Sequence, residues 1–206
     1  WFRMYQAALP MGKARVQTYY KFANAAVFPE TMYFWGLPNN GDYGWNNTAP
    51  ETANGYIRRY WNGSMELTAQ MLDRYDFTQD HQFAKDTLVP LADPLISFLD
   101  QYWPKRDANG KIRFDPAQSL ETWHVAVNPM PEIAGLRFLL PRLLALPKTL
   151  TTESQRSRWA RMLQELPPVP VGEVDGVKLL RPADSFSAGA NSENPVSLPD
   201  VWCRPA

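Results

Sequence analysis

The sequence predicts a mainly α protein built from antiparallel helix hairpins, with a small β-hairpin near the C-terminus. Segments with the apolar spacing of helices recur along residues 1–166, and short links join them. After residue 166 the pattern changes, and Asp175-Gly176 marks the turn between two short strands. No segment repeats at a fixed period, which argues against an array of helical repeats.

Composition and charge limit the classes of function. The 206 residues are 45% hydrophobic and 20% charged, which is typical of a globular chain of about one domain. The 21 basic and 21 acidic residues cancel, so the chain lacks the net positive charge that favours nucleic acid. Arginines interrupt the longest apolar stretch, at residues 133–146, which is shorter than the roughly 20 residues of a membrane span. We expect neither a nucleic-acid partner nor a membrane span, and the oligomeric state stays open.

The first part of the chain predicts two helices separated by a long loop. Residues 11–22 have helix-forming composition, and Pro10 stands where the start of a helix tolerates proline. Residues 28–50 lack periodicity and are rich in Gly, Pro and aromatic side chains. Loops above about 12–15 residues are uncommon in compact domains and are often functional. Helical spacing resumes over residues 56–75.

A third helix follows a short link. Asp80 is a suitable N-cap for a helix that runs towards Trp103, because its carboxylate can accept a bond from a backbone N–H of the first turn. Pro90 and Pro94 are expected to kink or break this helix. A turn at residues 107–110 ends the segment and leads into a short extended piece.

Two further helices and the β-hairpin complete the predicted elements. One helix covers residues 131–146 and opens with a proline in its first turn. The next covers residues 152–166, with a threonine as its cap. Residues 169–180 form the predicted β-hairpin. The residues after it are expected to be loop-like.

The scarcity of cysteine and histidine limits the chemistry. Cys203 is the only cysteine, so no disulfide forms within the chain and no thiolate metal site can be assembled. His81 and His124 are too few for a histidine-rich metal centre. The sequence contains no Gly-x-Ser-x-Gly elbow, phosphate-binding loop, dinucleotide fingerprint or zinc-protease motif. We expect no metal and no cofactor.

A carboxylate among aromatic residues is the main candidate for catalysis. Glu121 directly precedes Thr122, Trp123 and His124. An apolar ring beside a carboxylic acid removes water, raises its pKa and suits it to protonate a leaving group. The alternative is structural: Glu121 caps a helix or pairs with an arginine such as Arg113. His124 either bonds substrate or packs beside the tryptophan.

Two other acids and an aromatic loop are further candidates beside Glu121. Glu30 and Glu66 are weaker candidates, since Glu66 has the helical spacing of a solvated face. Indole faces stack on sugar rings and amides bond hydroxyl groups, so a loop that combines them suits carbohydrate; self-packing of the loop is the alternative. The residues of this loop are Trp35, Asn39, Asn40, Tyr43 and Trp45.

Several segments resemble a known family. Residues 75–80, with Phe83 and Pro90-Leu91 after them, resemble the helix-hairpin signature of six-hairpin glycosidases. The order of features is similar to glycoside hydrolase family 95, the inverting 1,2-α-L-fucosidase group, and more closely to an uncharacterised bacterial branch related to it. The segments that carry this likeness are residues 27–36, 120–123, 128–137 and 191–195.

The resemblance implies a fold and an organisation. It covers nearly the whole chain up to Pro195 and implies part of an (α/α)6 toroid. Residues 1–166 would be a partial catalytic domain, and residues 167–206 a loop and β-hairpin extension with an atypical tail at 196–206. Because the chain begins at Trp1 and departs from the family pattern after Pro195, we expect a truncated or frame-shifted piece that is inactive alone. The resemblance also implies a periplasmic or secreted parent, although no signal peptide is present in the chain.

The resemblance implies a hydrolytic mechanism. Glu121 matches the general acid, but the flanking Leu120 and Thr122 replace a Pro and an Asn, which affects substrate identity. The family's water-activating asparagines and carboxylate have no counterpart here. The oligosaccharide or polysaccharide substrate would contact residues of the aromatic loop and several others. These others are Arg58, Arg59, Trp61, Trp123, His124 and Asn128.

Other functions stay open at this point. A non-catalytic carbohydrate-binding or degenerate barrel would bind sugar without Glu121. A helical scaffold that binds protein is the next alternative, although the aromatic loop and the absence of a repeat disfavour it. A lyase or phosphorylase on the same fold is also possible in principle, because a fold does not determine chemistry.

Overall fold

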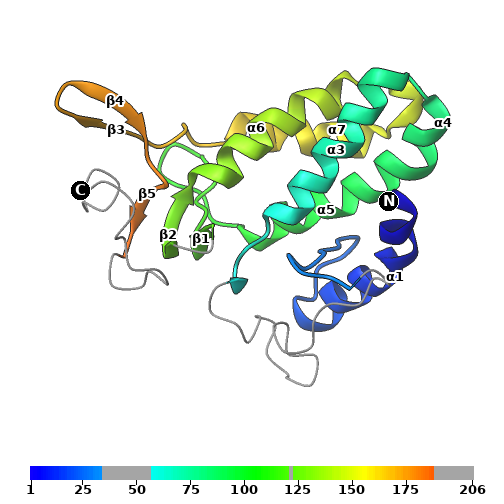
Figure 1. The fold of residues 1–206 in the computed structure, drawn as a ribbon, viewed down its shortest axis with the longest axis horizontal. Helices are drawn as coiled ribbons and strands as arrows, with labels where there is room; N and C mark the ends of the chain where they lie inside the picture. Colours follow the sequence, from blue (N-terminus) through cyan, green and yellow to red (C-terminus); the bar gives the residue numbers. More distant parts are fainter. Residues whose placement is uncertain (34–56, 121–122, 188–206) are drawn as a thin grey trace.

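The computed structural model describes residues 1–33, 57–120 and 123–187, and helices form most of it (Figure 1). The prediction of a mainly α fold with a small β-hairpin near the C-terminus is confirmed. The longer helices are α1 (Phe2–Tyr19), α3 (Asn62–Thr78), α5 (Val89–Tyr102), α6 (Met130–Ala145) and α7 (Glu153–Glu165). Shorter turns are α4 (His81–Phe83), a π-helical stretch (Ala84–Leu88) and a 3-10 turn (Lys148–Leu150).

The strands form two small antiparallel sheets. One contains three strands in the order β1-β2-β5, and the other is the β3-β4 hairpin. Their bounds are β1 (Ala117–Ser119), β2 (Trp123–Pro129), β3 (Val171–Val174), β4 (Val177–Leu180) and β5 (Ala183–Phe186). In the hairpin, Val174 pairs with Val177, and Asp175-Gly176 forms the turn with positive φ angles of 51° and 78°. The predicted turn residues are therefore confirmed.

Two antiparallel helix pairs are present: α3 packs with α5, and α6 packs with α7. At the start of α3, the Trp61 ring lies 5.1 Å from Phe98 and 5.4 Å from Tyr102, near the end of α5. Between α6 and α7, Arg137 donates to the Pro167 carbonyl at 2.7 Å, and Arg156 donates to the Leu144 carbonyl at 2.7 Å. In each pair the start of one helix therefore lies near the end of the other.

The first helices of the two pairs, α3 and α6, run side by side in the same direction. A Cβ on Gly135 of α6 would lie 2.9 Å from the Met65 sulfur of α3, so the absence of a side chain permits this approach. Further along, Arg142 of α6 donates to Asp73 at 2.8 Å and to Asp76 at 2.6 Å, both on α3. The starts of α3 and α6 therefore lie together, and so do their ends.

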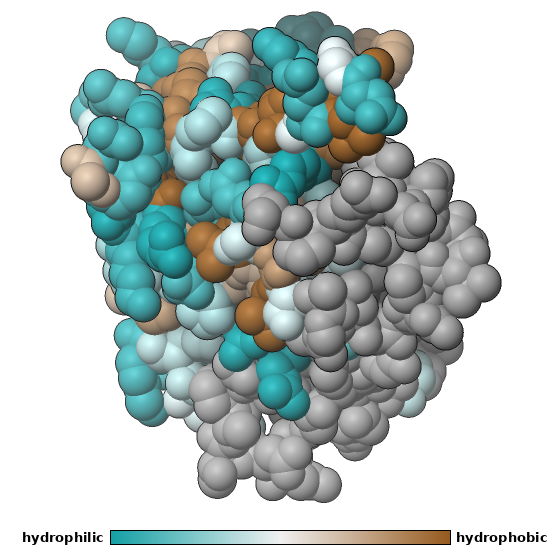
Figure 2. Space-filling model, turned by 90° about the vertical axis from the view of Figure 1, so that its left-hand side faces the viewer, coloured by the Kyte–Doolittle hydropathy of each residue, from teal (hydrophilic) through white to brown (hydrophobic). Residues whose placement is uncertain are grey.

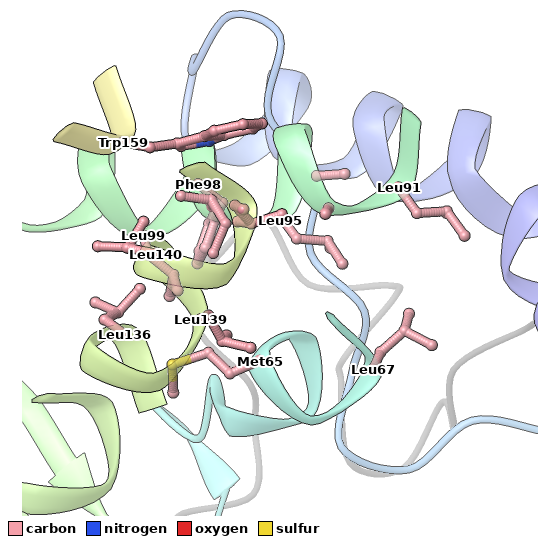
Figure 3. Packing of buried hydrophobic residues seen from close by; sticks show 14 of the residues in the cluster. Met65, Leu67, Leu91, Leu95, Phe98, Leu99, Leu136, Leu139, Leu140 and Trp159 are labelled. Atoms are coloured by element: carbon pink, nitrogen blue, oxygen red, sulfur yellow. The ribbon is translucent and has the colours of Figure 1, made fainter. Parts of the chain in front are cut away.

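A single apolar core joins these helices (Figure 3). Trp159 of α7, Phe98 of α5 and Leu140 of α6 are all 0% exposed, so three helices meet without water between them. Burial of apolar side chains of this size contributes roughly 1.5–3 kcal/mol each. Other members labelled in Figure 3 are Met65, Leu67, Leu91, Leu95, Leu99, Leu136 and Leu139.

Predicted caps are present at two helix starts. The Asp80 carboxylate accepts from the Phe83 backbone N–H at 2.9 Å. Thr152 and Gln155 form a reciprocal capping box, in which each side chain accepts from the other residue's backbone N–H. Both signals depend only on residues three apart in sequence, which is why the sequence alone revealed them.

The prolines differ in their effects. Pro10 lies inside α1, which begins at Phe2, so its predicted place before the helix is wrong. The helix predicted from Asp80 towards Trp103 is interrupted directly before Pro90, where the π-helical stretch separates α4 from α5. Pro90 lies in the first turn of α5, whereas Pro94 lies inside that helix and does not end it, since the helix continues to Tyr102. Pro90 cannot bond the carbonyl of Asp86, but the Gln6 side chain donates to this carbonyl at 3.0 Å. Tertiary contact with α1 therefore satisfies a group that the proline leaves open.

The sheet β1-β2-β5 was not predicted, and the residues after the hairpin are not simply loop-like. Val127 of β2 pairs with Ser185 of β5. Both strands are short, and their pairing joins segments far apart in sequence, which local patterning cannot reveal. The sheet connects residues 183–186 to the strand that precedes α6.

The surface of the described part is mixed. Figure 2 shows the side that carries the β3-β4 hairpin, where hydrophilic residues surround separate hydrophobic ones. Val171, Val177 and Leu180 of the hairpin are exposed. Of the helices in residues 1–33, 57–120 and 123–187, none combines the length and apolar character needed to cross a membrane.

Candidate functional site

The region around the predicted acid is framed by β1 and β2. Ser119 at the end of β1 pairs with Trp123 at the start of β2. Leu120 has a positive φ of 53°, and 48% of it is exposed. Glu121 and Thr122 lie outside the described residues, so the role of Glu121 stays a prediction. The structure does describe its neighbours on both sides.

β1 is tied to the segment that leads into α3. The Gln118 side chain is 1% exposed, and its carbonyl oxygen accepts from the Arg59 backbone N–H at 3.1 Å. A buried amide that makes such a bond fixes the distance between the two segments. Residues 57–61 and residues 117–120 are therefore neighbours, although about 60 positions separate them in sequence.

A pocket of about 290 Å³ lies between α3 and α6, beside the end of β1. Leu120 contributes one wall, the starts of α3 and α6 contribute others, and most of the lining is apolar. Its size is near the lower limit of small-molecule sites. The lining residues are Asn62, Met65, Glu66, Ala69, Leu120, Pro131, Gly135, Phe138 and Leu139.

Several buried polar atoms without hydrogen-bond partners lie at the starts of these two helices, and others lie elsewhere in the described residues. Those at the helix starts are Nε1 of Trp61, Oδ1 of Asn62, Oγ of Ser64 and both carboxyl oxygens of Glu132. Native proteins satisfy most buried polar groups, and each exception costs roughly 1–3 kcal/mol. The starts of α3 and α6 therefore carry a local cost in stability, as functional sites often do.

Glu132 is the most unusual of these groups. It is 0% exposed and lies in the first turn of α6, on the same helix face as Leu136, Leu140 and Leu143, which are also buried. Burial raises the pKa of this carboxyl to about 8, and the residue's own backbone N–H only partly opposes the shift. A carboxyl with this pKa is protonated at neutral pH and donates a hydrogen bond where an ionised one only accepts.

Glu66, the other carboxyl near the pocket, is exposed and lines the wall formed by α3. The pKa of the Tyr5 phenol on α1 is raised, mainly because the phenol is partly buried and secondly because of the negative charge of Glu66. Among the described residues, no group of three or more His, Cys, Asp or Glu side chains could hold a metal ion.

The sequence-predicted binding residues have several environments. Trp123 is 5% exposed and packs on Phe186 of β5, with ring centroids 4.5 Å apart. Trp61 is 4% exposed and belongs to the aromatic contacts between α3 and α5. His124 and Arg59 are partly exposed, and Arg58 is exposed. Their roles toward substrate stay predictions. The other predicted binding residues, at positions 35, 39, 40, 43 and 45, lie outside the described residues.

The Asn128 side chain links the segment before β1 to strand β5. Its side-chain oxygen accepts from the Phe114 backbone N–H at 2.9 Å, and its Nδ2 donates to Asp184 of β5 at 2.7 Å. Its φ of 52° is left-handed, which asparagine tolerates better than most residues. Its predicted contact with substrate is untested, whereas these bonds to the protein are observed.

Sequence reasoning missed Asn62 and Glu132 as site residues. Glu132 carried a signal, because a carboxylate at the spacing of Leu136 and Leu140 interrupts the apolar face of a helix. Asn62 carried none, since its position at the pocket depends on how α3 packs against α6. Glu66, a weaker candidate from the sequence, lies beside the pocket in the structure.

Comparisons with known proteins identify the family. The model of the glycosyl hydrolase family 95 catalytic domain matches residues 2–178, most of the chain. Among curated proteins, the comparison finds no match. This family assignment agrees with the helix-hairpin architecture and gives a carbohydrate as the substrate class. The chain belongs to glycosyl hydrolase family 95.

Proposed function

We propose that this chain supplies the general acid of an inverting glycosidase that cleaves α-linked L-fucosyl groups, and that Glu121 is this acid. The observation that carries the proposal is the position of Leu120. It directly precedes Glu121 in sequence and lines the pocket between α3 and α6. Family membership supplies the reaction class, hydrolysis of a glycosidic bond.

The proposed reaction needs two groups on opposite sides of the sugar. A protonated Glu121 gives its proton to the glycosidic oxygen as the bond from that oxygen to the anomeric carbon breaks. A base on the opposite face takes a proton from water, whose oxygen attacks the anomeric carbon and inverts its configuration. The two groups must be about 6.5–9.5 Å apart to leave room for this water. The family's water-activating groups have no counterpart in this sequence, so the base stays unassigned.

The predicted binding residues remain part of the proposal. Arg58, Arg59, Trp61, Trp123, His124 and Asn128 belong to it, together with Trp35, Asn39, Asn40, Tyr43 and Trp45 of the aromatic loop. Support comes from the link between Gln118 and the Arg59 backbone, which holds the segment before α3 beside β1. Flat aromatic faces and polar side chains are the groups that sugar rings require.

The test is Glu121→Gln in the full-length protein. In an α-1,2-fucosyl disaccharide the leaving group is a sugar alcohol, which leaves poorly unless it is protonated. We expect hydrolysis of this substrate to fall by about 10²–10⁴-fold, because general acid catalysis is lost. An aryl fucoside with a good leaving group needs less protonation, so its hydrolysis should fall much less. Glu153→Gln, on the exposed start of α7, is the matched control. Equal activity of Glu121→Gln and the control on the disaccharide would refute the assignment.

The products separate the alternatives. An inverting hydrolase releases β-L-fucose first from an α-fucoside, which NMR of the fresh product detects. A phosphorylase would require phosphate, and a lyase would leave an unsaturated sugar. Sugar binding without turnover, unaffected by Glu121→Gln, would indicate a non-catalytic carbohydrate-binding protein.

A further inference from the structure

The pocket between α3 and α6 has the size of a site for a small molecule. Its volume of about 290 Å³ is near the lower limit of such sites, so one sugar ring fits better than an extended chain. Its lining is mostly apolar with a few polar groups, the usual pattern where polar groups fix the orientation of a ligand.

Glu66 gives the pocket an accessible polar group. It lines the wall formed by α3, and its side chain is exposed. A carboxylate oxygen accepts hydrogen bonds, so a sugar hydroxyl can donate to it. Asn62, one turn earlier on α3, lines the same wall, but its Oδ1 is buried out of reach of a water-sized group.

Phe138 provides an aromatic surface at the same pocket. It lines the pocket from α6, and 53% of the residue is exposed. The Arg142 guanidinium lies 4.6 Å from the centroid of the Phe138 ring and also pairs with Asp73 and Asp76. Because the ion pairs hold the guanidinium in place, its contact with the ring restricts how the ring can move. An exposed, fixed aromatic ring is suited to stack against the C–H face of a sugar.

We propose that the pocket between α3 and α6 is a subsite for one sugar ring, in which Glu66 accepts from a sugar hydroxyl and Phe138 stacks on the ring. This inference rests on the proposed function for the identity of the ligand as carbohydrate. It adds the place of binding and the residues that determine it. Leu120 connects the subsite to the chain segment that carries Glu121.

The test measures binding of the methyl glycoside of α-L-fucose and of fucosyl-α-1,2-galactose to the full chain, by titration with NMR detection. Phe138→Ala should weaken binding of at least one probe by about tenfold, the loss expected for an aromatic contact worth about 1.4 kcal/mol. Phe77→Ala removes another exposed ring, on α3 and absent from the pocket lining, and should leave binding unchanged. Ala69→Phe would fill the pocket from a partly exposed position and should abolish binding.

The possible results separate the subsite from the proposed function. Sugar binding that Phe138→Ala and Ala69→Phe both leave intact would overturn the subsite, while Glu121 would still be judged by its own hydrolysis assay. Failure of the unmodified chain to bind either sugar would also overturn the subsite. Binding of an apolar dye, but of no sugar, would instead identify the pocket as an apolar docking surface. Circular dichroism of each variant verifies folding.

Discussion

The two ends of the α3–α6 pair differ in how the helices are joined. At the far end, Arg142 bonds both Asp73 and Asp76 and links the helices through ion pairs. At the near end a pocket opens between the helices, and the buried oxygens of Asn62 and Glu132 lack partners. The same two helices therefore combine an end joined by ion pairs with an end that is open to a ligand.

This difference follows from the geometry of the approach. Near the pocket, Gly135 has no side chain, so the Met65 side chain packs closely against α6. At the far end, long side chains span the gap. A binding site needs polar groups that are not already bonded within the protein. Such groups lower stability locally, and the stability of the surrounding core offsets this loss.

The largest expected effect concerns Glu132 at the pocket end. Its folded-state pKa of about 8 exceeds the ordinary value of 4.5, so the folded protein binds a proton that the unfolded chain releases. The free energy of unfolding therefore falls as pH rises from about 4.5 to about 8. Glu132→Gln removes this dependence, and above pH 8 it should be more stable than the unmodified protein by on the order of 3–5 kcal/mol.

Chemical denaturation at pH 4.5, 6.5 and 8.5 measures this difference. The gap between Glu132→Gln and the unmodified protein should widen with pH and nearly vanish at pH 4.5. Glu66→Gln, an exposed carboxylate on α3, controls for the loss of one negative charge. A gap that stays constant over the whole range would show that Glu132 is not held as a protonated acid.

A smaller effect is expected at the closed end. Arg142→Ala removes the bonds to Asp73 and Asp76, and because both carboxylates are more than half exposed, the loss should be about 1 kcal/mol. Thermal denaturation at low and high salt measures it, and added salt should reduce the difference because it screens exposed charges. A loss of several kcal/mol, independent of salt, would contradict the view that these ion pairs are weakly stabilising surface contacts.

The smallest effect compares two glycines on the facing helices. A Cβ on Gly63, in the first turn of α3, would meet no atom within 4 Å, so Gly63→Ala should stabilise the protein by about 0.5 kcal/mol through helix propensity. The same change at Gly135 must displace the Met65 sulfur at 2.9 Å, which should cancel this gain. Denaturation midpoints of the two variants test the comparison, and an equal gain at both sites would show that Met65 yields freely.

Local signals in the sequence determined much of the secondary structure. Asp80 and Thr152 cap helices through bonds to residues three positions away, and Asp175-Gly176 forms a turn from its own backbone preference. The hairpin signature and the motifs of family 95 likewise lie in continuous stretches of sequence. Such features need no knowledge of the rest of the chain, because the interacting atoms are neighbours in sequence.

Tertiary structure alone decided the prolines, the sheet and the pocket. Gln6 of another helix bonds the Asp86 carbonyl, to which Pro90 has no N–H to donate, and β2 pairs with β5, which lies far along the chain. Asn62 lines a pocket because α3 packs against α6, and Glu132 is buried although its side chain is acidic. The chemistry of a side chain is fixed by sequence, whereas its exposure, partners and pKa depend on which distant segments pack around it.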